Sequence, residues 1–205
     1  MHKLSISDFS LYSGKISKSI LSWKDCNLKS SIKTPLFDVN TVYREHPDGV
    51  RKGEFVQVKS KNWVNIIPLF IDNNGDRFFV VENQFRHGSC EVTLEFPAGI
   101  VEDGEDAKTA ALRELKEETG LVAKKITQIG KINPNPAFMS VIGNYFLAED
   151  LYFTGEQKFD KNEDIEVMLI SEKDAFLNMG AEHNTNGSML IALFYYLKFQ
   201  DMINF

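Results

Sequence analysis

A glycine-bounded stretch from Gly99 to Leu121 constrains the fold of this chain more than any other segment. It opens with a loop between Gly99 and Gly104, and the apolar residues that follow recur every three or four positions, which predicts a helix. These residues are Ala107, Ala110, Ala111 and Leu115. Gly120 is typical of the C-terminal cap of such a helix. The stretch therefore predicts a loop, a helix and a defined helix end in succession.

Three carboxylates share another face of this predicted helix. Glu114, Glu117 and Glu118 stand at i, i+3 and i+4, so their side chains converge on one patch. Like charges at this spacing repel each other, and a bound cation would relieve that repulsion. Carboxylate oxygens favour Mg²⁺ or Mn²⁺, which proteins usually hold together with substrate phosphates. The alternative is a solvated acidic face, with Lys116 as a local counter-charge.

The whole stretch resembles the Nudix box, because every fixed position of that motif is matched. The matching residues are Gly99, Glu105, Arg113, Glu114, Leu115, Glu117, Glu118, Gly120 and Leu121. The resemblance implies a metal-dependent hydrolase of nucleoside diphosphates linked to another group. It also implies which residues bind the metal, namely Glu114, Glu117, Glu118 and the backbone carbonyl of Ala98. Glu105 and Arg113 are implied to form an ion pair that ties the loop to the helix and orients the carboxylates.

The composition is that of an ordinary globular protein of 205 residues, with 43% hydrophobic and 25% charged residues. A net charge of −6 gives no basic field for nucleic acid or acidic lipids. Cys26 and Cys90 fit neither a disulfide framework nor a metal-binding pattern. The N-terminus lacks the apolar region of a signal peptide, and the longest apolar run, Met189–Leu197, is too short to span a bilayer. We therefore expect a cytoplasmic protein that binds neither nucleic acid nor membrane.

The remaining segments predict mainly strands, with two helices near the C-terminus. Expected strands cover 36–43, 54–58, 63–71, 77–84, 91–96, 126–132, 141–148 and 165–170. Asn74-Gly75 predicts a hairpin turn, and Pro68 predicts a bulge or a sheet edge at its position. A short helix is expected to start at Ser171 and to stop at Gly180, and a final helix is expected over 188–200.

Two short motifs before the box narrow the resemblance. Asn83-Gln84-Phe85-Arg86 and Leu94-Glu95-Phe96-Pro97-Ala98-Gly99 are similar to the Nudix branch that includes ADP-ribose and nucleotide-sugar pyrophosphatases. In that branch an arginine at the position of Arg86 contacts substrate phosphate, for which a planar guanidinium is suited. The alternative for Arg86 is a surface salt bridge to a carboxylate such as Glu91.

The segments after the box supply two further candidates. Phe138, in the proline-containing loop 133–140, either stacks on a base or sugar of the substrate or belongs to the core. The loop before the last strand resembles the one that supplies the general base in ADP-ribose pyrophosphatases. We therefore expect Glu163 to be that base, with Asp160, Asp164 and Glu166 as alternatives.

Together these patterns predict an α+β protein with the Nudix fold, a mixed β-sheet sandwiched between α-helices. We expect an N-terminal extension over 1–59, with a β-hairpin that forms homodimer contacts, and a Nudix domain over 60–205. The expected activity is Mg²⁺-dependent hydrolysis of a nucleoside diphosphate sugar, a small-molecule substrate. The alternatives are a nucleotide-binding sensor without catalysis, or a hydrolase of nucleoside triphosphates or dinucleoside polyphosphates.

Overall fold

The computed structural model describes residues 20–155, 157–159, 164–181 and 186–202. The chain forms two compact units. The smaller one contains the described residues up to Lys33 together with Val39–Gln57, and the larger one contains Thr34–Asp38 and the chain from Val58 onward. The glycine-bounded stretch and its flanking motifs all belong to the larger unit.

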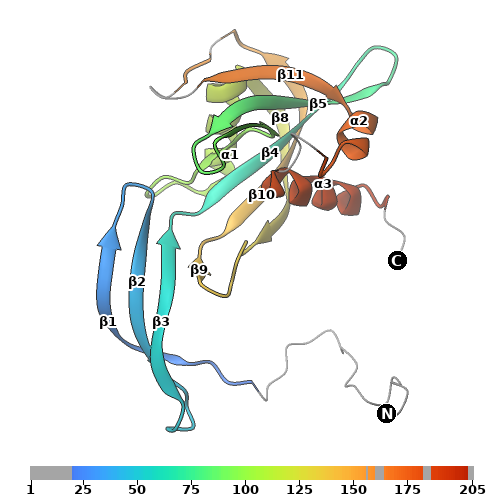
Figure 1. Ribbon diagram of the computed structural model, residues 1–205. Coiled ribbons are helices and arrows are strands. Elements are labelled where there is room, and N and C mark those ends of the chain that lie inside the picture. Colours follow the sequence, from blue (N-terminus) through green and yellow to red (C-terminus); the bar gives the residue numbers. More distant parts are fainter. Residues whose placement is uncertain (1–19, 156, 160–163, 182–185, 203–205) are drawn as a thin grey trace, which may run out of the picture. The chain divides into compact units, whose positions relative to one another are not determined.

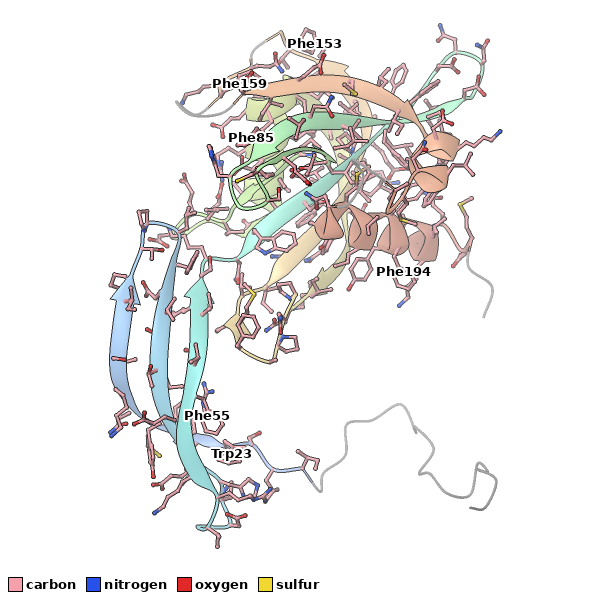
Figure 2. All side chains as sticks on the ribbon, viewed as in Figure 1. Trp23, Phe55, Phe85, Phe153, Phe159 and Phe194 are labelled. Atoms are coloured by element: carbon pink, nitrogen blue, oxygen red, sulfur yellow. The ribbon has the colours of Figure 1, made fainter. Side chains whose placement is uncertain are left out.

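The smaller unit is built mainly from three long strands, which lie side by side in Figure 1. They are β1 (Lys24–Lys33), β2 (Phe37–Glu45) and β3 (Lys52–Ser60). Trp23 packs edge-to-face on Phe55, with ring centroids 5.4 Å apart (Figure 2). The sequence predicted the β2–β3 pair, whereas β1 is an additional strand. It escaped prediction because nearly all of its residues are exposed, so its sequence shows no alternation of apolar and polar positions.

A seven-stranded mixed sheet forms the centre of the larger unit, with the strand order β11-β5-β4-β10-β8 and with β6 beside β5 and β7 beside β4 (Figure 1). The strands are β4 (Trp63–Ile71), β5 (Arg77–Arg86), β6 (Glu91–Glu95), β7 (Ala98–Ile100), β8 (Leu121–Ile132), β10 (Gly143–Phe153) and β11 (Ile165–Ser171). A short strand, β9 (Met139–Ser140), pairs in parallel with the end of β3. β4 and β10 run parallel, whereas β5 pairs with β4, β6 and β11 in antiparallel fashion.

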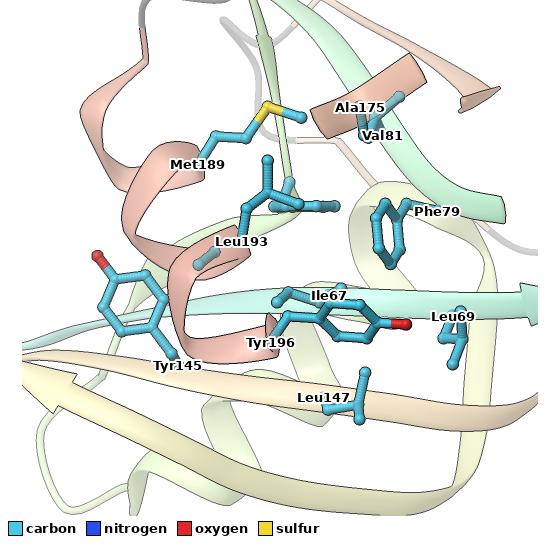
Figure 3. Close-up of a cluster of buried hydrophobic side chains, with 12 residues drawn as sticks. Ile67, Leu69, Phe79, Val81, Tyr145, Leu147, Ala175, Met189, Leu193 and Tyr196 are labelled. Carbon is cyan, nitrogen blue, oxygen red and sulfur yellow. The ribbon is translucent and has the colours of Figure 1, made fainter. Parts of the chain in front are cut away.

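Helices cover both faces of this sheet, as expected from the sequence. Successive side chains of a strand point to opposite faces. Val64 and Ile66 of β4 pack with the apolar side of α1 (Ala107–Thr119), whereas Ile67 and Leu69 pack with α3 (Gly187–Phe199). Figure 3 shows the cluster on the α3 side, which also includes Ala175 of α2 (Glu172–Leu177). The sheet is therefore sandwiched between helices, with α1 and α3 on opposite faces.

Pro68 was expected at a bulge or a sheet edge, and it does not lie on an edge strand. Pro68 is buried in the central strand β4, where it stands opposite Ala148 of the parallel neighbour β10. On its other side β4 pairs with β7 over Trp63–Asn65 and with β5 over Leu69–Ile71. Pro68 falls between these two pairing segments, where a missing backbone N–H breaks no ladder bond on that side.

The last elements begin as predicted and end slightly differently. Ser171 caps α2, because its hydroxyl accepts a hydrogen bond of 3.0 Å from the backbone N–H of Asp174. The helix ends at Leu177, before Gly180, because Asn178 already has a non-helical backbone. Within the described ranges, no helix combines the length and apolarity needed to cross a membrane.

Candidate active site

Helix α1 is fixed at both ends, which holds the acidic side chains on it in place. The Asp106 carboxylate accepts hydrogen bonds of 2.9 Å from the backbone N–H groups of Lys108 and Thr109. Gly120 closes the helix in a left-handed conformation, with φ at 69°, and its N–H bonds to the carbonyl of Lys116. Both caps follow from residue type, because a carboxylate accepts from free N–H groups and glycine tolerates a positive φ.

The carboxylates of α1 line one cavity of about 870 Å³, together with the strand β7 that precedes the helix. Glu114, Glu117 and Glu118 all contribute to its wall, as do Ala98 and Gly99. Glu118 is buried, and its Oε2 accepts a hydrogen bond of 3.0 Å from the backbone N–H of Ala98. The structure therefore brings together all of the residues predicted to bind a metal.

Gly99 makes room for one of these carboxylates. A Cβ atom placed on Gly99 would overlap the carboxylate of Glu114. The first glycine of the motif is thus required by close packing against the helix, not by an unusual backbone angle.

Arg113 is the centre of the ionic network around the cavity. Its guanidinium donates two hydrogen bonds of 3.0 Å to Glu105, which is the predicted ion pair. It also donates to Glu114 at 2.8 Å and to Glu117 at 3.0 Å. The guanidinium holds the pKa of Glu105 below its ordinary value, and its pairing, first of all with Glu105, raises the pKa of Arg113.

In this structure Glu114, Glu117 and Glu118 are oriented by protein groups. Among the described residues, no group of three or more His, Cys, Asp or Glu side chains has the geometry to hold a metal ion. Arg113 supplies the positive charge between Glu114 and Glu117, and the N–H of Ala98 binds Glu118. The donor set is nevertheless one of hard carboxylate oxygens around a single cavity, which fits a small divalent cation.

Arg86 lies at the same cavity, and its side chain is 45% exposed. It forms a two-pronged ion pair with Glu95 at 2.7 and 2.6 Å, which raises the pKa of Arg86. The salt-bridge partner considered from the sequence was Glu91, which stands opposite Arg86 in the β5–β6 ladder. Glu95 is buried, so it has the greater need for a counter-charge.

The other candidates lie apart from these residues or outside the described part of the chain. Phe138 is 45% exposed, so it is not a core residue, and it is not among the described residues that line the cavity. Glu163 and Asp160 lie outside the described residues. Asp164 is exposed, and Glu166 on β11 accepts a hydrogen bond of 3.2 Å from Asn83.

Two residues that hold the end of α1 at this site were missed from the sequence. Lys158 lines the cavity, and its backbone N–H donates to the carbonyl of Glu117 at 2.8 Å. The side chain of Gln157 donates to the carbonyl of Glu118 at 2.7 Å. They satisfy the last carbonyl groups of α1, which have no partner within the helix. A polar segment after a strand gives no periodic signal from which this role could have been predicted.

Comparison with known proteins supports the same interpretation. The family model described as NUDIX domain matches residues 61–190. The ADP-ribose pyrophosphatase of Bacillus subtilis (strain 168) is 41% identical over 97 residues, which are 47% of this chain and 52% of that enzyme. The match thus spans about half the length of this curated relative.

Two further similarities extend over more of the chain. The ADP compounds hydrolase NudE of Escherichia coli (strain K12) is 30% identical over 138 residues, covering 67% of this chain and 72% of that protein. A solved structure titled "Crystal structure of ADP compounds hydrolase" superposes with a TM-score of 0.73 at 25% identity, over 91% of this chain and 100% of the other. With the motif residues gathered around one cavity, these matches show that the chain belongs to the Nudix family and to its branch of ADP-ribose pyrophosphatase relatives.

Proposed function

We propose that this protein hydrolyses the diphosphate bond of a nucleoside diphosphate sugar of the ADP-ribose type, with Mg²⁺ as cofactor. The products are a nucleoside monophosphate and a sugar phosphate. The observation that carries the proposal is that one cavity is lined by the glutamates of α1 together with the cationic residues Arg86 and Lys158. Carboxylates suit a divalent cation and the cationic groups suit phosphate oxygens, so the cavity matches both halves of a metal-bound diphosphate.

Glu114, Glu117, Glu118 and the carbonyl of Ala98 would hold the cation. When bound, a divalent cation neutralises the charge of a diphosphate and lowers the pKa of a coordinated water. Arg113 bridges and orients two of these carboxylates, and the Ala98 N–H orients the third. These contacts define positioning roles for Arg113 and Glu105, which act through the carboxylates.

Arg86 would bind the diphosphate while Glu95 holds its guanidinium in place. The guanidinium has five N–H donors, and the pair with Glu95 uses two of them, so donors are left for phosphate oxygens. Glu163 would accept the proton of the attacking water, with Asp160, Asp164 and Glu166 as the alternative bases.

The decisive experiment measures the release of nucleoside monophosphate, with and without Mg²⁺, from a substrate panel. The panel contains ADP-ribose, ADP-glucose, UDP-glucose, GDP-mannose, a dinucleoside polyphosphate and a nucleoside triphosphate. We expect Mg²⁺-dependent cleavage concentrated on the sugar diphosphates. No cleavage of any compound would overturn the proposal in favour of a binding protein, and cleavage of the triphosphate alone would change the substrate class.

Two substitutions test the assignment of the carboxylates. Glu118→Gln should lower kcat by about 100-fold or more, because a metal ligand and its charge are lost. Glu102→Gln is the matched control, since Glu102 lines the same cavity but is exposed and lies outside the proposed ligand set. Equal activities for the two variants would contradict the metal assignment. An unchanged rate for Glu163→Gln at saturating Mg²⁺ would transfer the role of base to one of its alternatives.

A further inference from the structure

A second cavity, of about 380 Å³, adjoins the one that contains the carboxylates. The two cavities share the lining residues Arg86, Ala98, Gly99 and Ile100. The remaining wall of the second cavity comes from Glu95 of β6, the beginning of β4 and the N-terminal end of α3. A ligand bound to Arg86 could therefore extend into either cavity.

Asn65 is the residue that marks this second cavity as a binding site. It lines the cavity from β4, is only 2% exposed, and stands between Ala98 of β7 and Tyr145 of β10 in the sheet. No donor among the described residues hydrogen-bonds to its Oδ1 atom. The Oδ1 atom itself has almost no accessible surface. A buried amide oxygen without a partner costs free energy, so a small turn of the side chain that brings Oδ1 to a donor in the cavity would be favourable.

The end of α3 adds further polar groups to the same wall. Asn186 caps the helix by accepting hydrogen bonds from the N–H groups of Ser188 and Met189 at 2.9 and 3.1 Å. The hydroxyl of Ser188 lies 3.4 Å from that of Tyr145, and either group could be the donor. Ser188 therefore offers a hydroxyl whose direction is adjustable, in the same cavity wall as Asn65.

An aromatic residue also lines the second cavity. Trp63 lines the cavity and packs against Gly143, where a Cβ atom would overlap its ring. Its ring also lies edge-to-face on Tyr145, with centroids 5.5 Å apart. The indole is therefore held in one position and offers a rigid apolar surface.

The chemistry of this wall selects its ligand. The charged groups among the described lining residues are Arg86 and Glu95, which pair with each other. Hydrogen-bonding groups beside an aromatic surface suit a sugar ring. A further phosphate would find no unpaired cationic group among the described lining residues. We infer that this second cavity binds the sugar of the nucleoside diphosphate sugar, with Asn65 Oδ1 accepting a hydrogen bond from a sugar hydroxyl.

This inference rests on the proposed function, and its test compares two substrates that share the same diphosphate. ADP-ribose carries a sugar, whereas the methyl ester of ADP carries a methyl group in its place, and both release AMP. For Asn65→Leu we expect the preference in kcat/KM for ADP-ribose over the methyl ester to fall about tenfold. The thermal unfolding temperature should stay the same or rise, because an apolar side chain replaces an unsatisfied amide.

Two further variants keep the test independent of folding. Ser188→Ala removes one hydroxyl and should lower the same preference by a few fold. Asn144→Leu is the matched control, since Asn144 is also buried on this sheet but its amide bonds to Gln128 and to the carbonyl of Trp63. Asn144→Leu should lower the unfolding temperature and leave the preference unchanged.

The outcomes separate the two proposals. If Asn65→Leu and Ser188→Ala cleave both substrates with the wild-type preference, the sugar site is wrong while the proposed function stands. If the wild-type protein cleaves neither substrate with Mg²⁺, the proposed function fails, and the sugar site fails with it.

Discussion

Gly99 and Glu114 are so close that a side chain on the glycine would occupy the space of the carboxylate. Gly99→Ala should therefore displace Glu114 from the cavity. We expect kcat to fall by about 100-fold, because small displacements of a catalytic group have effects of this size. Thermal unfolding should change little, since alanine is tolerated in a strand and restricts the unfolded chain.

The control for this prediction is a strand glycine with free space. Gly53→Ala in β3 meets only an ordinary contact with Phe55 at 3.9 Å, so its kcat should equal that of the wild type. Steady-state kinetics and thermal unfolding of both variants provide the measurement. Full activity of Gly99→Ala would show that the position of Glu114 does not matter for turnover.

The central features of this site could be predicted because they depend on local sequence. The ends of α1 and the pairing of Glu105 with Arg113 lie within one short stretch, and the motif fixes their spacing. The place of Arg86 beside the strand expected over 77–84 was likewise predictable, and Arg86 is the last residue of β5. Its partner was not, because the register of β5 and β6 and the burial of Glu95 depend on the whole sheet.

Other features had no local signal. β7 is only three residues long, and it is the strand that places Ala98 and Gly99 beside the helix. β8 starts at Leu121 instead of 126 because its first residues pair with Leu151–Phe153, an extension of β10 that carries few buried side chains. The second cavity is lined by residues of β4 and α3, which are far apart in the sequence, so it exists only in the folded chain.

Substitutions should separate two roles of the Arg86–Glu95 pair, namely its contribution to the stability of the fold and that of Arg86 to substrate affinity. Arg86→Lys keeps the charge but loses the two-pronged geometry, so KM should rise by about tenfold. Removing the cation altogether would leave the buried Glu95 without its counter-charge, with only the hydrogen bond from the Thr93 hydroxyl. Because Arg86 is half-exposed, the cost should be about 1–3 kcal/mol. The double variant Arg86→Met/Glu95→Gln should recover much of that stability while KM stays high. A wild-type KM in the double variant would reduce Arg86 to a structural role.

Asp106 should make the stability of α1 depend on pH. Hydrogen bonds, first of all from Thr109, lower the pKa of this carboxylate below its ordinary value of 3.8. The folded pKa thus lies below the unfolded one, so the stabilisation is present above about pH 3.8 and disappears as the pH falls through the folded value. Asp106→Asn keeps a capping oxygen that does not titrate.

The measurement for Asp106 is the unfolding temperature of both proteins from neutral pH to well below pH 3.8. The difference between the wild-type protein and Asp106→Asn should be constant at neutral pH and should change only below about pH 3.8. A difference that does not vary over the whole range would show that the charge of Asp106 contributes nothing to the cap.

Gln157 should affect metal binding through the last turn of α1. Its side chain and the N–H of Lys158 bind the carbonyls of Glu118 and Glu117, so these contacts hold the turn that carries two proposed metal ligands. Gln157→Met removes the donor and should lower stability by up to about 1 kcal/mol. The Mg²⁺ concentration for half-maximal activity should also rise severalfold, because a looser turn orients the carboxylates less well.

Gln128→Met is the matched control for Gln157→Met. The side chain of Gln128 donates a hydrogen bond of 3.1 Å to Asn144 on β10, so this bond does not involve α1. The control variant should lose comparable stability with an unchanged Mg²⁺ requirement, whereas equal Mg²⁺ requirements in the two variants would mean that the contact of Gln157 serves stability alone.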